Sequence, residues 1–218
     1  MISIDSPFDL STKLLAHLPK DGGFFIEAGA NNGVWQSNTL ALETEKGWHG
    51  LLIEPNHQKF LECKTNRPHH KNIFYHGALV AFDYKKKYIQ GYFGSQAYGD
   101  ALMAQVADDY TAFDPQNTRW ENQQLIDVPA LKLSNILDHH KIEVIDFLSL
   151  DVEGYELHAL NGLDLNRHRP HTICVECWGK EPQHHNHQLF VEINEKFAQY
   201  NYKLEKELTA SDFIFTPK

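Results

Sequence analysis

The chain has 218 residues, with 29 acidic and 20 basic side chains and a formal net charge of −9. This balance disfavours nucleic acid and anionic lipid as partners, because phosphate groups are bound by clustered positive charge. The length fits a single domain, and no apolar run approaches the ~20 residues that span a bilayer. The start of the chain lacks a secretion signal, and three cysteines do not make a disulfide framework. We therefore expect a soluble, cytoplasmic protein.

The first third of the chain alternates between short apolar runs and amphipathic segments. The predicted helices are 9–18, 37–46 and 58–66, and the predicted strands are 24–26, 51–53 and 73–75. Strands that are apolar throughout, each followed by a helix, are typical of a parallel sheet covered on both faces. The pattern therefore predicts an α/β domain.

Residues 79–124 interrupt this alternation with glycines among aromatic residues and a long polar stretch. We interpret them as an irregular insertion within one domain, 1–218. The alternation then resumes, with predicted strands at 126–128, 145–150, 172–175, 203–208 and 213–215 and predicted helices at 133–140, 155–161 and 188–200. The short turn between the last two strands predicts an antiparallel hairpin at one edge of the sheet.

The most informative segment is the turn after the first strand, residues 27–33 (EAGANNG). Gly29 and Gly33 suit a turn that needs positive φ angles and a close approach of a ligand to the backbone. The spacing E-x-G-x-x-x-G is not the dinucleotide pattern G-x-G-x-x-G, so the segment favours a nucleoside without a pyrophosphate. Glu54 ends the second strand, where such folds place the acid that binds ribose hydroxyls. A tight connection without a ligand is the alternative interpretation.

Three segments together carry a resemblance to a known family. They are residues 25–33 (FIEAGANNG) with the following SNT at 37–39, residues 47–55 (GWHGLLIEP), and residues 145–157 (IDFLSLDVEGYEL). In these segments the chain resembles the FkbM family of S-adenosylmethionine (SAM)-dependent methyltransferases, and the similarity extends over about residues 23–215. Other members carry Lys-Ile-Asp where this chain has Ser-Leu-Asp at 149–151, so no role of such a lysine is transferred.

The resemblance implies a class I methyltransferase fold, which is a Rossmann-like, doubly wound, seven-stranded sheet, mostly parallel with an antiparallel last strand. It also implies SAM as the cofactor, with Glu27 and the glycines at its methionine end and ribose, Glu54 at the ribose diol, and Gly77 at the adenine. The start of the helix predicted at 37–46 would face the cofactor carboxylate. The full set of implied cofactor-binding residues is Glu27, Gly29, Ala30, Asn31, Gly33, Ser37, Asn38, Thr39, Glu54, Pro55, Gly77, Ala78 and Asp151.

Two acidic residues, Asp151 and Glu153, follow a strongly apolar strand, at the edge where open α/β sheets bind ligands. Residues two apart in an extended segment point to the same side, so both can face a substrate. The alternative is that one of them caps the helix that begins near residue 155. An alkyl hydroxyl is a weak nucleophile that needs a general base, and Asp151 is our first candidate for that role. One of the three histidines in the cluster after the next strand, His184, His185 or His187, is a further candidate.

Asp151 also has a predicted neighbour in Glu176, which ends the adjacent strand. Adjacent strands lie about 4.8 Å apart, so the two carboxylates could share a divalent ion such as Mg²⁺. In the alternative, Glu176 only supports a neighbouring residue by accepting a hydrogen bond. The C-x-x-C at 174–177 is not expected to bind zinc, because residues three apart in a strand face opposite sides.

The sequence thus favours a SAM-dependent O-methyltransferase that acts on a hydroxyl of a sugar, a glycan or a glycosylated metabolite. Two alternatives stay open, a nicotinamide-dependent oxidoreductase on a similar fold and a non-catalytic module that binds the cofactor for a larger assembly. The partners that we expect are a small-molecule or glycan acceptor, with no nucleic acid and no membrane, and the sequence is compatible with a homodimer.

Overall fold

A computed structural model describes residues 10–92, 125–177, 179–184 and 187–218, together with the backbone of 105–106. Its helices are α1 (Leu10–His17), α2 (Leu40–Lys46), α3 (His57–Asn66), α4 (Leu133–His140), α5 (Glu156–Leu160) and α6 (His187–Gln199). No helix in these described ranges combines the length and the apolar character that are needed to cross a membrane.

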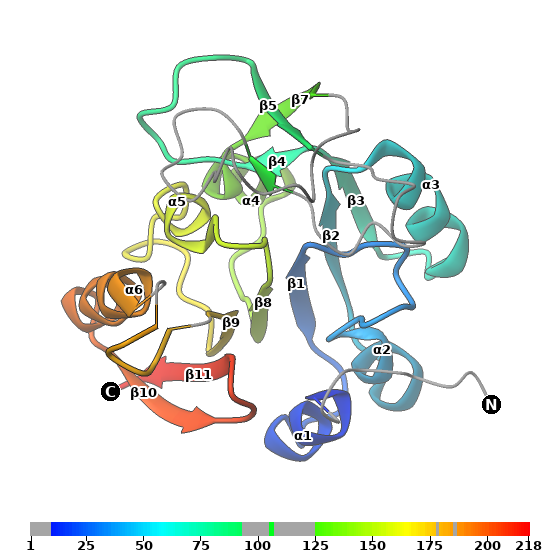
Figure 1. The fold of residues 1–218 in the computed structure, drawn as a ribbon. Helices are drawn as coiled ribbons and strands as arrows, with labels where there is room; N and C mark the ends of the chain where they lie inside the picture. Colours follow the sequence, from blue (N-terminus) through cyan, green and yellow to red (C-terminus); the bar gives the residue numbers. More distant parts are fainter. Residues whose placement is uncertain (1–9, 93–104, 107–124, 178, 185–186) are drawn as a thin grey trace.

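The main sheet has seven strands in the order β10-β11-β9-β8-β1-β2-β3 (Figure 1). Their bounds are β1 (Phe24–Ala28), β2 (His49–Glu54), β3 (Ile73–His76), β8 (Phe147–Leu150), β9 (Thr172–Glu176), β10 (Tyr202–Glu207) and β11 (Asp212–Pro217). Only β11 runs antiparallel to its neighbours, β9 and β10. The predicted α/β fold class, with its antiparallel last strand, is therefore confirmed.

Each face of the main sheet is buried beneath three helices. Along β1, Phe25 packs with residues of α1, α2 and α3, whereas the next residue, Ile26, packs with residues of α4, α5 and α6. This alternation follows from the pleat, which points successive side chains to opposite faces. The central strands β1, β2, β8 and β9 are largely apolar because both of their faces are covered. Polar side chains that could bind a ligand or react are therefore expected at the ends of the strands.

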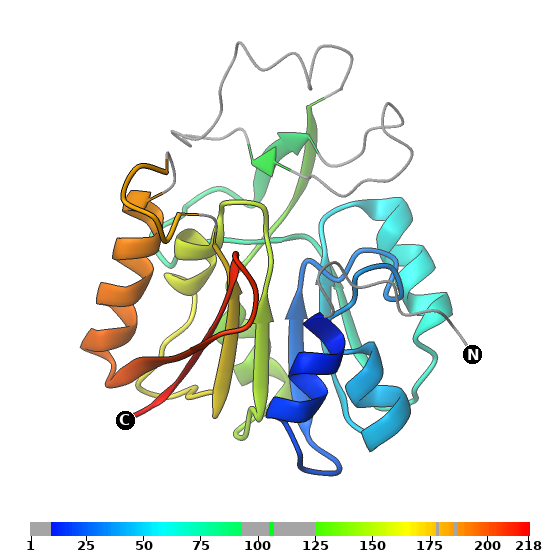
Figure 2. The ribbon, with the colours of Figure 1, turned by 60° about the horizontal axis from the view of Figure 1, so that its bottom comes forward.

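A second, smaller sheet is formed by part of the predicted insertion and the segment after it. Its order is β4-β7-β5-β6, with β4 (Ala78–Leu79), β5 (Tyr88–Tyr92), β6 (Gln105–Val106) and β7 (Ile126–Leu131). Figure 2 shows this sheet beyond the carboxyl ends of the main strands, and its buried residues pack against Tyr155. The predicted strand 126–128 thus belongs to the small sheet. The other insertion residues, 93–104 and 107–124, lie outside the described residues.

Candidate functional site

The order of the main strands reverses direction between β1 and β8, which places a switch point at their carboxyl ends. Chain order runs outward from β1 to β2 and β3 on one side, and from β8 to β9 on the other. Open α/β sheets bind ligands just outside such a point. Here the backbone N–H of Asp151 donates to the carbonyl oxygen of Ala28 at 3.1 Å, and the N–H of Gly29 donates to that of Ile53 at 3.0 Å. The glycine turn therefore lies between the ends of β2 and β8.

Gly29 and Gly33 both adopt positive φ angles, +86° and +77°, as the sequence predicted. A Cβ at Gly29 would lie 1.8 Å from the carbonyl oxygen of Asp151. A Cβ at Gly33 would lie 2.7 Å from Cγ of Arg67 and 2.9 Å from Sγ of Cys63. The close approach that requires these glycines is thus made by the protein's own atoms. The sequence interpretation had assigned that approach to a ligand.

Glu54 lies at the end of β2 with its carboxylate against the glycine turn. Oε2 accepts from the backbone N–H of Asn31 and Oε1 from that of Asn56, both at 2.7 Å. Burial raises the pKa of Glu54 to about 7, although the two backbone N–H groups oppose this shift. Among the described residues, each carboxylate oxygen accepts a single hydrogen bond and has the capacity for another. A vicinal diol, with two hydroxyl donors, matches this arrangement.

Glu27, at the end of β1, has its carboxylate in a dense network with residues 37–39. It accepts from the hydroxyls of Ser37 at 2.9 Å and Thr39 at 2.7 Å, and from the backbone N–H of Asn38 at 2.7 Å. Helix α2 begins at Leu40, three residues later than predicted. Glu27 therefore occupies the position before α2 that the sequence interpretation gave to the cofactor carboxylate. Direct contacts of these four residues with a cofactor stay a prediction.

Arg67, which the sequence analysis missed, completes this network from the end of α3. It is fully buried, and its guanidinium lies 2.8 Å from Glu43 and 3.5 Å from Glu27. It also donates to the carbonyl oxygen of Gly33 at 3.1 Å. Arginine is almost never fully buried unless it is paired, and no local signal marks this one. The pairing appears only when α2, α3 and the glycine turn are brought together.

The residues predicted to border the adenine lie beside the backbone of Glu54. The N–H of Gly77 donates to the carbonyl oxygen of Glu54 at 3.1 Å, and a ring nitrogen of His76 lies 3.0 Å from that of Pro55. Ala78 then enters the small sheet opposite Ala130. Position alone supports a role at the adenine, and the contact stays a prediction.

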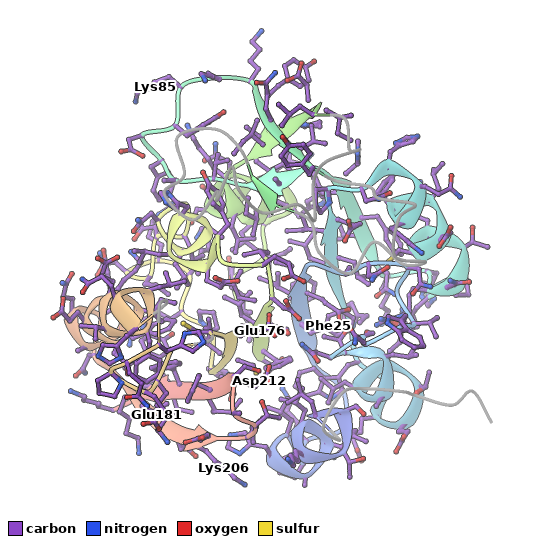
Figure 3. All side chains as sticks on the ribbon, viewed as in Figure 1. Phe25, Lys85, Glu176, Glu181, Lys206 and Asp212 are labelled. Carbon is purple, nitrogen blue, oxygen red and sulfur yellow. The ribbon has the colours of Figure 1, made fainter. Side chains whose placement is uncertain are left out.

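Asp151 and Glu176 lie side by side, as their strand ends predicted. Leu150 of β8 is paired with Val175 of β9, so the following residues are neighbours, and their carboxyl groups are hydrogen-bonded. Burial and the charges of Glu176 and Glu153 raise the pKa of Asp151 well above its usual range. Figure 3 shows Glu176 close to Asp212, its register partner on β11. The pair therefore holds a proton readily.

The predicted metal site is not supported by the structure. Within the described ranges, no group of three or more histidine, cysteine, aspartate or glutamate side chains is arranged to hold a metal ion. Asp151 and Glu176 are bound to each other, which uses lone pairs that a cation would need. The described cysteines, Cys63, Cys174 and Cys177, are free thiols that are buried in the core.

The turn after β8 is held by a second residue that the sequence analysis missed, Glu156. Its Oε1 accepts from the backbone N–H groups of Val152 at 3.1 Å and Gly154 at 3.0 Å. Glu153, between them, has a left-handed φ of +57°. Burial raises the pKa of Glu156 to about 7. Glu153 lies close enough to Asp151 for its charge to affect that residue. Because Glu153 is in a turn and not in an extended segment, the prediction that both acids face a substrate stays a prediction.

One candidate base cannot be placed. His185 lies outside the described residues, so its predicted role stays a prediction. The described neighbour His187 begins α6, and its ring nitrogen Nδ1 lies 2.8 Å from the carbonyl oxygen of Gly179.

The strand order, with a glycine turn at the switch point and an acid ending β2, defines a class I methyltransferase fold. A comparison with family models agrees, since the model of the methyltransferase FkbM domain matches residues 27–204. The chain belongs to the FkbM methyltransferase family, whose members are SAM-dependent enzymes. This membership favours methyl transfer over the hydride transfer of a nicotinamide-dependent oxidoreductase.

Several solved structures are similar to this chain at low sequence identity. A SAM-dependent methyltransferase from Geobacter sulfurreducens, in complex with S-adenosyl-L-homocysteine, is 11% identical, with 94% of this chain and 68% of that chain covered and a TM-score of 0.48. A similar complex from Thiobacillus denitrificans has the same identity and coverage and a TM-score of 0.43. A methyltransferase from Pyrococcus furiosus is 12% identical, covers 94% and 80%, and has a TM-score of 0.42. No curated protein matches the chain. These similarities are too distant to inform the substrate.

Proposed function

We propose that the chain is a SAM-dependent O-methyltransferase that methylates a hydroxyl group of a sugar, a glycan or a glycosylated metabolite. The observation that carries this proposal is the position of Asp151. Its backbone contacts the glycine turn at Ala28 and Gly29, and its carboxyl group has a raised pKa. A proton acceptor thus lies directly beside the turn that we assign to the cofactor.

The cofactor assignment rests on Glu54 and the backbone around it. SAM supplies a methyl group on a positively charged sulfur atom and is joined to an adenosine. Glu54 would accept from the two ribose hydroxyls, because both of its carboxylate oxygens have acceptor capacity and both are fixed by backbone N–H groups. Gly77 and Ala78 would lie along the adenine. The paired side chains of Glu27 and Arg67 stabilise the conformation of the glycine turn, because Arg67 donates to the carbonyl oxygen of Gly33.

Asp151 would act as the general base toward the acceptor hydroxyl. A carboxylate with an ordinary pKa near 4 is a weak base for an alcohol, and raising that pKa improves the match to neutral pH. The hydrogen bond to Glu176 keeps the carboxyl group of Asp151 in one orientation, which favours an aligned approach of the hydroxyl. With the shared proton on Glu176, ionised Asp151 takes the hydroxyl proton while the oxygen bonds to the methyl carbon and the bond from that carbon to the sulfonium sulfur breaks.

The acceptor class is supported by the family resemblance, because members of the FkbM family typically methylate sugars or hydroxyls of secondary metabolites. The acidic chain also favours an acceptor without phosphates. The small sheet packs on Tyr155, four residues after Asp151, so it is the described element best placed to contact an acceptor.

The proposal is tested by incubating the protein with SAM and a panel of free sugars and glycosides, with release of S-adenosylhomocysteine as the readout. We expect methylation on oxygen, and we expect Asp151→Asn to lower kcat by about 10²–10⁴-fold. Glu143→Gln serves as the control, because Glu143 is exposed and precedes β8 at the opposite edge of the sheet. A product methylated on nitrogen or carbon, or full turnover by Asp151→Asn, would contradict the proposal.

A further inference from the structure

The acids at the ends of β8 and β9 have different neighbours from the acids that are paired with basic side chains elsewhere in the described chain. Burial has the largest effect on the pKa of Asp151, and the charged groups that follow it, Glu176, Glu153 and Glu156, are all negative. Elsewhere, Glu27 and Glu43 share Arg67, and Asp146 is paired with Lys20 at 2.8 Å. Among the described residues, none of the groups with the largest effect on Asp151 is a cation. Their combined potential is therefore negative.

One atom in this cluster lacks a hydrogen-bond partner altogether. Glu156 is 1% exposed, and its Oε1 is used by Val152 and Gly154, whereas its Oε2 has no partner among the described residues. A buried carboxylate oxygen without a donor is costly, so such an atom calls for an explanation. The charge of Glu176 acts on Glu156, and that of Glu156 acts on Asp151, so Glu156 belongs electrostatically to the same group of acids.

The cluster carries a net negative charge that suits a cationic ligand. Asp151 and Glu176 are hydrogen-bonded to each other, which requires that one of the two carry a proton. The pair then has one negative charge, and Glu156 adds at most one more. A cation on a bound ligand would offset part of this charge, and no set of three ligands for a metal ion is present in the described part of the chain.

We propose that Asp151, Glu156 and Glu176 form a subsite for a positive charge, and that this subsite makes the enzyme bind its sulfonium donor more tightly than the neutral thioether product. The inference rests on the proposed function, because it is that function which places a donor sulfur at the switch point. Asp151 touches the glycine turn through its backbone, so the subsite adjoins the proposed cofactor site. Methyl transfer removes the positive charge from the donor sulfur. The thioether product then binds more weakly and is released more readily.

The inference is tested by calorimetric titration of the whole chain, without acceptor, with three ligands. These are SAM, the neutral thioether S-adenosylhomocysteine, and sinefungin, in which a protonated amine stands in place of the sulfonium group. We expect the two cationic ligands to bind about tenfold more tightly than the thioether. We expect Glu176→Gln and Glu156→Gln to bring the three Kd values within about threefold of one another. Glu143→Gln, which removes an exposed charge, should leave the preference intact.

Every outcome of these titrations either supports the proposed subsite or overturns it. Equal binding of the three ligands to the wild-type chain, or tighter binding of the thioether, overturns the subsite while leaving the proposed cofactor site standing. Binding of none of them overturns the proposed function as well. Should a glutamine variant fail to fold, as judged by its circular dichroism spectrum, the wild-type comparison still tests the inference. If both folded variants still bind the cationic ligands more tightly than the thioether, then other groups are responsible for that preference and the proposed subsite is rejected.

Discussion

Two groups of buried acids flank the glycine turn, and they are held in different ways. Glu27 and Glu43 share the guanidinium of Arg67, and the oxygens of Glu27 accept hydrogen bonds from residues 37–39. On the other side of the turn, Asp151 and Glu156 have other acids as their strongest electrostatic neighbours, and one oxygen of Glu156 has no partner in the described chain.

This difference distinguishes the acids that stabilise the glycine turn from the acids that we assign to the reaction. A charge-balanced network that uses its hydrogen bonds internally stabilises one conformation and has little left to offer a ligand. An unbalanced group of acids is costly to the fold, and such groups are concentrated at functional sites. We therefore assign the shape of the turn to the Arg67 network and the reaction to the acids after β8.

The largest effect is expected from breaking the balanced network. Arg67→Met should lower the free energy of unfolding by about 3–5 kcal/mol, because it leaves Glu27 and Glu43 buried without their cation. Arg167→Met is the control, since the guanidinium of Arg167 is half exposed where it pairs with Asp138 and Asp164, and should cost under ~1 kcal/mol. Urea denaturation measures both changes. Equal losses would show that the buried network is not a special source of stability.

A somewhat smaller effect is expected at Gly29, where the glycine turn contacts the backbone of Asp151. In Gly29→Ala the new Cβ would collide with the carbonyl oxygen of Asp151, so we expect a loss of more than ~2 kcal/mol in stability and a weaker Kd for S-adenosylhomocysteine. Gly47→Ala is the matched control, because Gly47 also has a positive φ but open space around its Cα. That variant should lose only about 1 kcal/mol and keep its affinity. Unchanged affinity in Gly29→Ala would argue against a cofactor at this turn.

The pH dependence of stability tests Glu54. Its pKa is about 7 in the folded chain and near its ordinary value of 4.5 when unfolded. Between these values the folded state binds more protons, so the stability that this group contributes falls as pH rises and levels off above pH 7. From pH 5.5 to 8 the wild type should lose about 2 kcal/mol more than Glu54→Gln does. Parallel pH profiles of the two proteins, measured by urea denaturation, would contradict the raised pKa.

The smallest effect is expected at the link between the two sides. The side-chain amide of Asn38 donates to the hydroxyl of Ser149 at 2.9 Å, and both residues are buried. Ser149→Ala leaves that donor without its partner, which should cost about 1–2 kcal/mol. Thr65→Ala, at an exposed hydroxyl on α3, should change stability by less than ~0.5 kcal/mol. A neutral Ser149→Ala would show that the link does not couple α2 to β8.

The sequence was sufficient for those parts of the site that depend on position along a strand. Glu54, Asp151 and Glu176 end apolar strands, and the carboxyl ends of parallel strands meet at one edge, so their grouping could be predicted. The antiparallel closing hairpin followed from a short turn between two strands.

The sequence was insufficient where a role depends on packing between distant segments. Arg67 acquires its partners only when α3 lies against α2, and Glu156 reaches back to a turn whose left-handed residue, Glu153, has no glycine to signal it. Helix α2 begins at Leu40 because residues 37–39 are engaged by Glu27, which local propensity does not reveal. The affiliation of residues 126–131 with the small sheet likewise depends on pairing with β5.

The central claim is that the turn after β1 and Glu54 together bind the adenosine of SAM. Calorimetric titration with S-adenosylhomocysteine, on the wild type and on Glu54→Gln, tests it most directly. One ligand should bind per wild-type chain, and Glu54→Gln should bind about tenfold more weakly, because a neutral amide accepts the ribose hydroxyls less strongly than a carboxylate. Absence of binding to the folded wild type, or an identical Kd for the variant, would contradict the claim.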